Sequence, residues 1–78
     1  MTLIEIFGSG CRKCEVLQER AIEAARNTGL QADIVKVTEF DRMMARGILS
    51  TPALALDGQL KFQGQVPTVR ALEDLFRA

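Results

Sequence analysis

Histidine, tryptophan and tyrosine are absent from this sequence of 78 residues. Without histidine the chain has no Cys–His nucleophile, no histidine-based zinc site and no imidazole for acid–base catalysis. Basic and acidic residues number ten each, so no net charge attracts nucleic acid or an anionic membrane. The phenylalanines form no cluster with basic residues on which nucleic-acid bases could stack. We therefore expect no nucleic-acid partner.

A long apolar run is missing as well. No segment approaches the ~18 consecutive apolar residues of a membrane-spanning helix. The first seven residues contain no basic segment, and Glu5 interrupts their apolar run, so we expect neither a signal peptide nor membrane insertion. These absences predict an intracellular, cytoplasmic protein. In a reducing compartment, two cysteines are more often catalytic or metal-binding than a structural disulfide.

The length of the chain limits its architecture. Residues 1–78 provide one domain, with no room for a second hydrophobic core. A chain this short buries only ~60% of its unfolded surface. The composition, 47% hydrophobic and 26% charged, is that of an ordinary soluble globular domain. We expect a monomer.

The spacing of apolar residues predicts seven elements. Short runs rich in apolar residues predict strands at 2–7, 31–37, 53–56 and 59–63. Apolar residues at helical spacing predict helices over 11–28, after Thr38 and after Thr68. In the short second helix we expect Thr38 to be the N-cap and Phe40, Met43 and Met44 to be buried.

The order of these elements, β-α-β-α-β-β-α, indicates an α/β domain. A helix between the first two strands favours their parallel pairing, and Asp57-Gly58 predicts a hairpin that adds an antiparallel edge strand. The predicted fold is therefore a four-stranded mixed sheet with helices on both faces.

Both cysteines lie where the first strand gives way to the first helix. Residues three apart on a helix share one face, so the sulfurs of Cys11 and Cys14 can reach bonding distance without backbone movement. Free backbone N–H groups and the helix dipole stabilise a thiolate at Cys11, and Arg12 and Lys13 add positive charge that lowers its pKa further. Cys14 falls in phase with the buried face and stays protonated.

This asymmetry favours thiol–disulfide exchange, in which Cys11 attacks a disulfide and Cys14 resolves the mixed disulfide. Three alternatives remain. Burial as a small apolar residue explains Cys14 but not Cys11, which lies between Gly10 and Arg12. The pair could also bind Cu(I), or zinc shared across a dimer, although small metallochaperones carry methionine at the position of Ser9 and end in a strand. A redox-sensing adaptor that changes partners on oxidation is not separable from an exchange enzyme by sequence.

Segments along nearly the whole chain, GSGCRKC, STPALALDG and GQVPT, resemble the thioredoxin/glutaredoxin superfamily. The resemblance is strongest to its small members of under 80 residues, which are described as redox-active disulfide proteins. It implies a thioredoxin-like fold and an oxidoreductase without a cofactor or metal. The implied partners are disulfide-containing protein substrates and an unidentified reductase, and no clear glutathione-site features point to glutathione in that role.

The resemblance also implies roles for three other residues. Pro52 would be a cis-proline facing the cysteines, and Thr51 would offer backbone hydrogen bonds to an extended substrate segment. Thioredoxins have a buried acid six residues before the first cysteine, the position of Glu5, which would accept the proton of Cys14. Alternatively, Glu5 points to solvent or pairs with a nearby lysine or arginine.

This chain departs from the thioredoxin pattern around the cysteines. It has no tryptophan before Cys11, and Arg12-Lys13 replaces Gly-Pro between the two cysteines. If the two cations dominate thiolate stabilisation, the reduction potential shifts upward from about −270 mV, the value typical of thioredoxin. A negative Glu5 opposes that shift. Arg12 and Lys13 are therefore expected to tune the potential.

Overall fold

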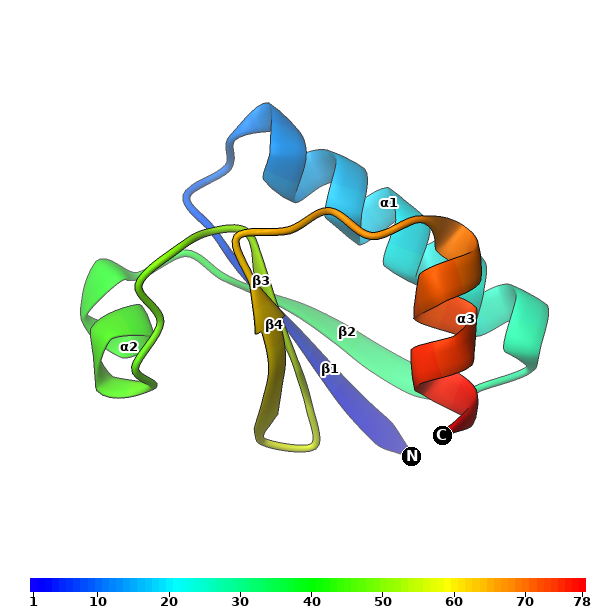
Figure 1. Ribbon diagram of the computed structural model, residues 1–78. Coiled ribbons are helices and arrows are strands. Elements are labelled where there is room, and N and C mark those ends of the chain that lie inside the picture. Colours follow the sequence, from blue (N-terminus) through cyan, green and yellow to red (C-terminus); the bar gives the residue numbers. More distant parts are fainter.

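The computed structural model describes residues 1–78 as one mixed β-sheet with three helices (Figure 1). In chain order the elements are β1 (Thr2–Phe7), α1 (Arg12–Thr28), β2 (Ala32–Val37), α2 (Phe40–Ala45), β3 (Ala53–Leu56), β4 (Gln59–Gln63) and α3 (Val69–Arg77). The strand order is β2-β1-β3-β4, with β1 and β2 parallel and the other two pairs antiparallel. The predicted α/β class, element order and mixed sheet are confirmed.

Alternation along β1 divides the core between the two faces of the sheet. Ile4 and Ile6 pack with side chains of α1 and α3 in the larger buried cluster. Phe7 points the other way and packs with Met43 of α2 in a smaller cluster. In Figure 1, α1 and α3 lie together while α2 lies apart from both. Each face of the sheet is thus covered by different helices.

The first helix is anchored by its buried stripe and by its two ends. Its buried residues recur at helical spacing and are Cys14, Leu17, Ala21, Ala24 and Ala25. Leu17 is fully buried, and truncating such a leucine to alanine costs about 2–5 kcal/mol. Cys11 is the N-cap, and Gly29 ends the helix in the left-handed conformation (φ 71°), which glycine adopts without strain. The cysteine pair therefore begins a firmly held helix.

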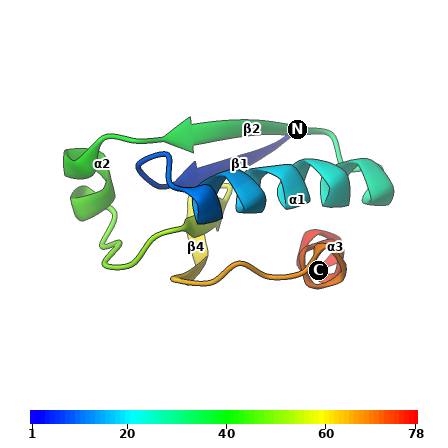
Figure 2. The same cartoon turned by 90° about the horizontal axis from the view of Figure 1, so that it is seen from above.

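The second helix differs from its prediction in two respects. Its N-cap is Glu39 rather than Thr38, and Phe40 and Met44 are exposed while Met43 is buried. Figure 2 shows the reason: the helix lies at the end of the sheet toward which β2 points, beside the loop that follows β1. A helix of six residues in that place turns only one side chain toward the sheet.

The predicted hairpin at Asp57-Gly58 and the predicted helix after Thr68 are confirmed. Asp57 and Gly58 both have positive φ angles, 49° and 87°, as a two-residue hairpin of the type I′ kind requires. The hydroxyl of Thr68 accepts a hydrogen bond from the Ala71 N–H at 3.1 Å and caps α3. The helices are all too short or too polar to cross a membrane.

Candidate active site

Cys11 and Cys14 form an unequal pair of free thiols. Cys11 is the exposed N-cap of α1, and the Glu15 N–H donates to its carbonyl at 3.1 Å to start the helix. Cys14 lies one turn inside the helix and is only 1% exposed. The two sulfur atoms are 2.7 Å apart and share a hydrogen bond. An accessible thiol and a buried thiol are thus held within reach of one another.

Their surroundings move the two pKa values apart. The hydrogen bond from the Cys14 thiol, followed by that from the Cys14 backbone N–H, holds the pKa of Cys11 below its ordinary value of 9.0. Burial, followed by the hydrogen bond to Cys11, raises the pKa of Cys14 above 9.0. A proton shared between the sulfurs therefore belongs to Cys14, and Cys11 is the thiol that ionises first.

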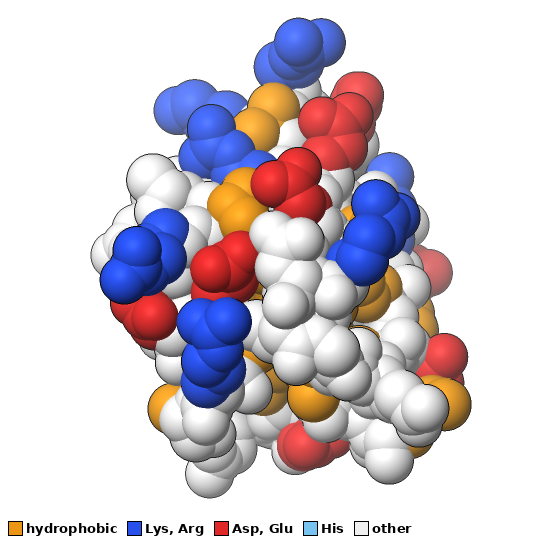
Figure 3. Space-filling view, turned by 90° about the vertical axis from the view of Figure 1, so that its right-hand side faces the viewer, with side chains coloured by type: hydrophobic (Ala, Val, Ile, Leu, Met, Phe, Trp, Pro, Cys, Tyr) orange, Lys and Arg blue, Asp and Glu red, His pale blue; other side chains and the backbone are white.

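Arg12 and Lys13 are exposed and make no ion pair or side-chain hydrogen bond. The chief causes that lower the pKa of Cys11 are the thiol and N–H of Cys14, with the backbone of Lys13 contributing less. Figure 3 shows positive side chains at the top of the molecule, the end at which α1 begins in Figure 1, and mixed charges below. The two cations therefore act on the thiols only through solvent-screened electrostatic attraction and not through a direct contact.

The loop that enters β3 lies beside the cysteines. Phe7 pairs with Ala53, so the preceding Pro52 is placed next to the residue that follows Phe7. The peptide bond between Thr51 and Pro52 is cis, and Pro52 is buried while Thr51 is exposed. The backbone N–H and C=O of Thr51 make no hydrogen bond within the chain. These two groups are free to bind an extended segment of another molecule.

Gln63, at the end of β4, holds this loop in place. Its side-chain oxygen accepts hydrogen bonds from the N–H groups of Leu49 and Ser50 at 2.8 and 3.1 Å. The Gly64 N–H donates to the Pro52 carbonyl at 2.8 Å. Sequence reasoning missed Gln63, because it identified residues 59–63 only as an edge strand and gave no contact for this side chain.

A pocket opens between the loop that carries Thr51, the loop after β1 and the start of α2. It is lined by Ser9, Thr38, Phe40, Met43, Ile48, Leu49 and Thr51. Two of its apolar side chains, Phe40 and Leu49, are 71% and 84% exposed. Exposed apolar side chains that line one hollow of the surface are typical of an interaction site. The sequence assigned Phe40 to the core and did not predict this pocket.

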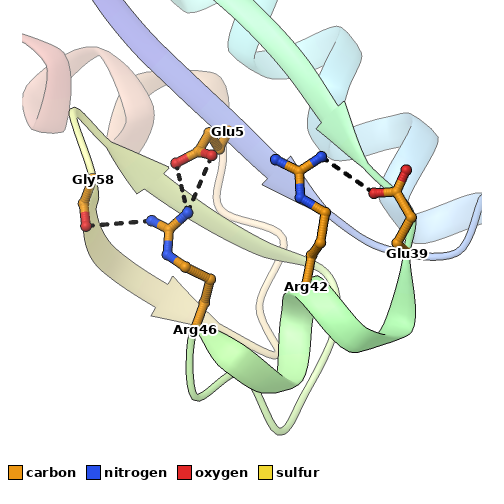
Figure 4. A network of polar contacts seen from close by, with 5 residues as sticks. All are labelled: Glu5, Glu39, Arg42, Arg46 and Gly58. Atoms are coloured by element: carbon orange, nitrogen blue, oxygen red, sulfur yellow. Dashed lines mark hydrogen bonds and ion pairs between the residues drawn. The ribbon is translucent and has the colours of Figure 1, made fainter.

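Glu5 does not lie with the cysteines. Alternation puts it on the face of Phe7 and Ala55, whereas α1 covers the opposite face of the sheet. Its carboxylate oxygens each lie 3.1 Å from the same nitrogen of Arg46, whose other terminal nitrogen donates to the Gly58 carbonyl (Figure 4). Of the two interpretations of Glu5, the ion pair is the one present. The sheet separates Glu5 from α1, and the hydrogen-bond partner of the Glu5 carboxylate is Arg46 rather than Cys14.

Arg46 was also missed by sequence reasoning. It ends α2, stacks over the Phe7 ring with the guanidinium carbon 5.2 Å from the ring centre, and neutralises Glu5. The only signal for it in the sequence was that a buried carboxylate needs a cationic partner. Nothing in the sequence selected Arg46 among the ten basic residues.

Comparison with known proteins identifies the family to which this arrangement of residues is similar. A family model described as a thioredoxin domain matches residues 2–77. A protein named thioredoxin from Methanothermobacter thermautotrophicus is 35% identical over 75 residues, which cover 96% of this chain and 97% of that protein. Another protein named thioredoxin, from Methanocaldococcus jannaschii, is 36% identical over 74 residues, which cover 95% of this chain and 85% of that protein. The range that the family model matches therefore spans β1, the cysteine pair and the Thr51–Pro52 loop.

Proposed function

The chain belongs to the thioredoxin family of thiol–disulfide oxidoreductases, and on that premise we propose that Cys11 attacks protein disulfides and Cys14 resolves the resulting mixed disulfide. The observation that carries this assignment is the inequality of the two thiols. Cys11 is exposed with a lowered pKa, and Cys14 is buried with a raised pKa, 2.7 Å away. An attacking thiol must be accessible and ionised, whereas a resolving thiol must lie close to the attacking sulfur and stay protonated until the mixed disulfide has formed.

The reaction proceeds in two exchanges. The Cys11 thiolate attacks one sulfur of a substrate disulfide, which breaks that bond and releases the other substrate sulfur as a thiolate. The Cys14 thiol then loses its proton and attacks the Cys11 sulfur, which releases the second substrate thiolate. The substrate has gained two electrons and the chain now holds a Cys11–Cys14 disulfide. A reductase, not identified by the structure, returns these electrons and restores the dithiol.

The surface next to Cys11 supports a protein as the substrate. Thr51 presents an unpaired backbone N–H and C=O, which suit an extended peptide segment. The adjoining pocket, with Phe40 and Leu49 at its rim, suits an apolar side chain of that segment. Small disulfides would leave both features unused. Pro52 and Thr51 are accordingly assigned to substrate binding.

Trapping of the mixed disulfide tests this proposal. Cys14→Ser lacks the resolving thiol, so it should accumulate a Cys11-linked adduct with insulin, a disulfide-bonded test protein. Cys11→Ser is the matched control and should form little adduct, because the thiol of Cys14 is 1% exposed. Reversed behaviour of the two variants would overturn the assignment of roles. No adduct with either variant would overturn the choice of protein disulfides as substrates.

Two other functions are less well supported. Soft-metal binding would rest on the two thiols alone, since no group of three or more His, Cys, Asp or Glu side chains lies close enough to hold a metal ion. A redox-sensing adaptor would use the same dithiol but would not turn over. Reduction of many insulin molecules per protein molecule, with a chemical reductant that regenerates the dithiol, would exclude that function. We place the protein in the cytoplasm, because two cysteines in a reducing compartment are more often catalytic than a structural disulfide. We expect it to act there as a monomer.

A further inference from the structure

Gly8, the residue after β1, lies directly against the thiol of Cys14. A β-carbon placed on Gly8 would overlap the Cys14 sulfur and would lie 3.0 Å from the Cys14 β-carbon. Gly8 continues the alternation of Ile4 and Ile6, so the missing side chain would point to the face covered by α1. The sulfur of Cys14 therefore occupies the volume that any other residue would fill at this position.

The conformation of Gly8 gives no other reason for glycine. The other five glycines of the chain have positive φ angles, but Gly8 does not. Its N–H donates to the Val37 carbonyl at 3.0 Å, which extends the pairing of β1 with β2 by one residue. The backbone is thus held in place, and the direction of a substituent at this position is fixed.

We propose that Gly8 is a positioning residue for the dithiol: the absence of its side chain lets the Cys14 thiol lie against the end of β1, where it reaches Cys11. This inference rests on the proposed function, because it concerns the resolving step. In that step the Cys14 sulfur bonds to the Cys11 sulfur while the bond from Cys11 to the substrate sulfur breaks. The proton leaves Cys14, and the substrate departs as a thiolate. A misplaced Cys14 sulfur slows this step without altering the attack geometry of Cys11.

Substitution of Gly8 by alanine should move the thiol rather than prevent folding. The overlapping atom is the terminal atom of a rotatable side chain, so rotation about the Cα–Cβ bond of Cys14 clears it. The remaining 3.0 Å contact between β-carbons needs an adjustment of only a few tenths of an ångström. After rotation, the 2.7 Å contact between the two sulfurs is lost. That contact is also the largest cause of the lowered pKa of Cys11.

The experiment compares Gly8→Ala in two backgrounds. In the otherwise wild-type chain, Gly8→Ala should raise the pKa of Cys11 toward 9.0, measured by the pH dependence of its alkylation by iodoacetamide. It should also slow release of reduced insulin from a preformed mixed disulfide by about tenfold or more. In the Cys14→Ala background no sulfur remains to be displaced, so adding Gly8→Ala should leave the pKa of Cys11 as it is in Cys14→Ala alone.

Each result decides the proposal. An unchanged pKa of Cys11 in Gly8→Ala, or a change that persists without the Cys14 sulfur, overturns it. If Gly8→Ala does not fold, folding of the double variant supports the sulfur contact, and failure of both variants to fold overturns it. A wild-type chain that never reduces insulin would refute the proposed function, yet the alkylation experiment would still test Gly8.

Discussion

One guanidinium nitrogen of Arg46 lies 3.1 Å from both carboxylate oxygens of Glu5, on the face of the sheet opposite α1. The Glu5 side chain is only 10% exposed, and the second terminal nitrogen of Arg46 donates to the Gly58 carbonyl at 3.3 Å. This arrangement ties the end of α2 to the hairpin between β3 and β4. The acid that the family resemblance assigned to proton transfer is therefore engaged in holding the fold together.

Loss of the Glu5–Arg46 ion pair should lower the stability of the fold and leave the rate of thiol–disulfide exchange unchanged. Arg46→Gln leaves a buried carboxylate without its partner and should lower the free energy of unfolding by about 1–3 kcal/mol in urea titrations. The matched control is Arg42→Gln on the same helix, whose pair with Glu39 is exposed and should contribute less than about 1 kcal/mol (Figure 4). Equal losses in the two variants would show that burial of the Glu5 pair has no energetic consequence.

Glu5→Gln tests whether the position of Glu5 across the sheet from α1 excludes it from the resolving step, and the measurement is the rate of that step. Because Glu5 lies across the sheet from α1, the substitution should leave the single-turnover rate of resolution unchanged from pH 6 to pH 8. A rate that falls in Glu5→Gln, with a pH dependence that the variant loses, would show that Glu5 does accept the proton of Cys14.

Reactivity of Cys11 should depend on pH in a direction set by Cys14. The thiolate is the reactive form, so the alkylation rate rises with pH, and its midpoint should lie below 9.0 because the pKa of Cys11 is lowered. Cys14→Ala removes the hydrogen bond that is the first cause of this lowering, so the midpoint should move up toward 9.0. A midpoint that stays in place would mean that the backbone N–H groups of α1 alone stabilise the thiolate.

The apolar pocket should distinguish large substrates from small ones. Truncation of Leu49 or Phe40 to alanine should raise the KM for insulin by about tenfold, as expected for the loss of one buried apolar contact. Activity on a small disulfide such as hydroxyethyl disulfide should not change. Leu60→Ala, a variant at an exposed leucine outside the pocket, is the control and should alter neither. Equal effects on both substrates would argue against a peptide-binding pocket.

Arg12 and Lys13 should tune the reduction potential by a small amount. Replacing both with glutamine removes positive charge near the Cys11 thiolate, which should lower the potential and make the protein more reducing. Exposed charges of this kind contribute about 0.2–1 kcal/mol each, equivalent to about 5–20 mV in a two-electron couple. Equilibration with glutathione measures the shift for each single substitution and for the pair, and Lys61→Gln on β4 controls for the loss of one charge. A potential unchanged in low salt would exclude the tuning role.

Features fixed by local spacing were predictable from the sequence. The positions of Cys11 and Cys14 at the start of a helix determine that one is exposed and the other buried. Gly29, the Asp57-Gly58 turn and the Thr68 cap likewise depend on neighbours along the chain. The roles of Thr51 and Pro52 came from the family resemblance and not from the residues themselves.

Features that depend on contacts across the fold were not predictable. Phe40 was assigned to the core from its spacing with Met43, but α2 lies at the end of the sheet and leaves Phe40 at the pocket. The partner of Glu5 lies 41 residues away in the sequence. The contact between Gly8 and the Cys14 sulfur joins the end of β1 to a side chain of α1. In each case the deciding contact joins elements whose relative placement the sequence pattern leaves open.

The inequality of the two thiols is tested most directly by labelling the reduced protein with a limiting amount of iodoacetamide at pH 7 and locating the label by mass spectrometry. We predict that nearly all of the label is on Cys11, because its pKa is lowered and its side chain is exposed while Cys14 is buried and protonated. Equal labelling of both cysteines, or preferential labelling of Cys14, would contradict the assignment of attacking and resolving thiols.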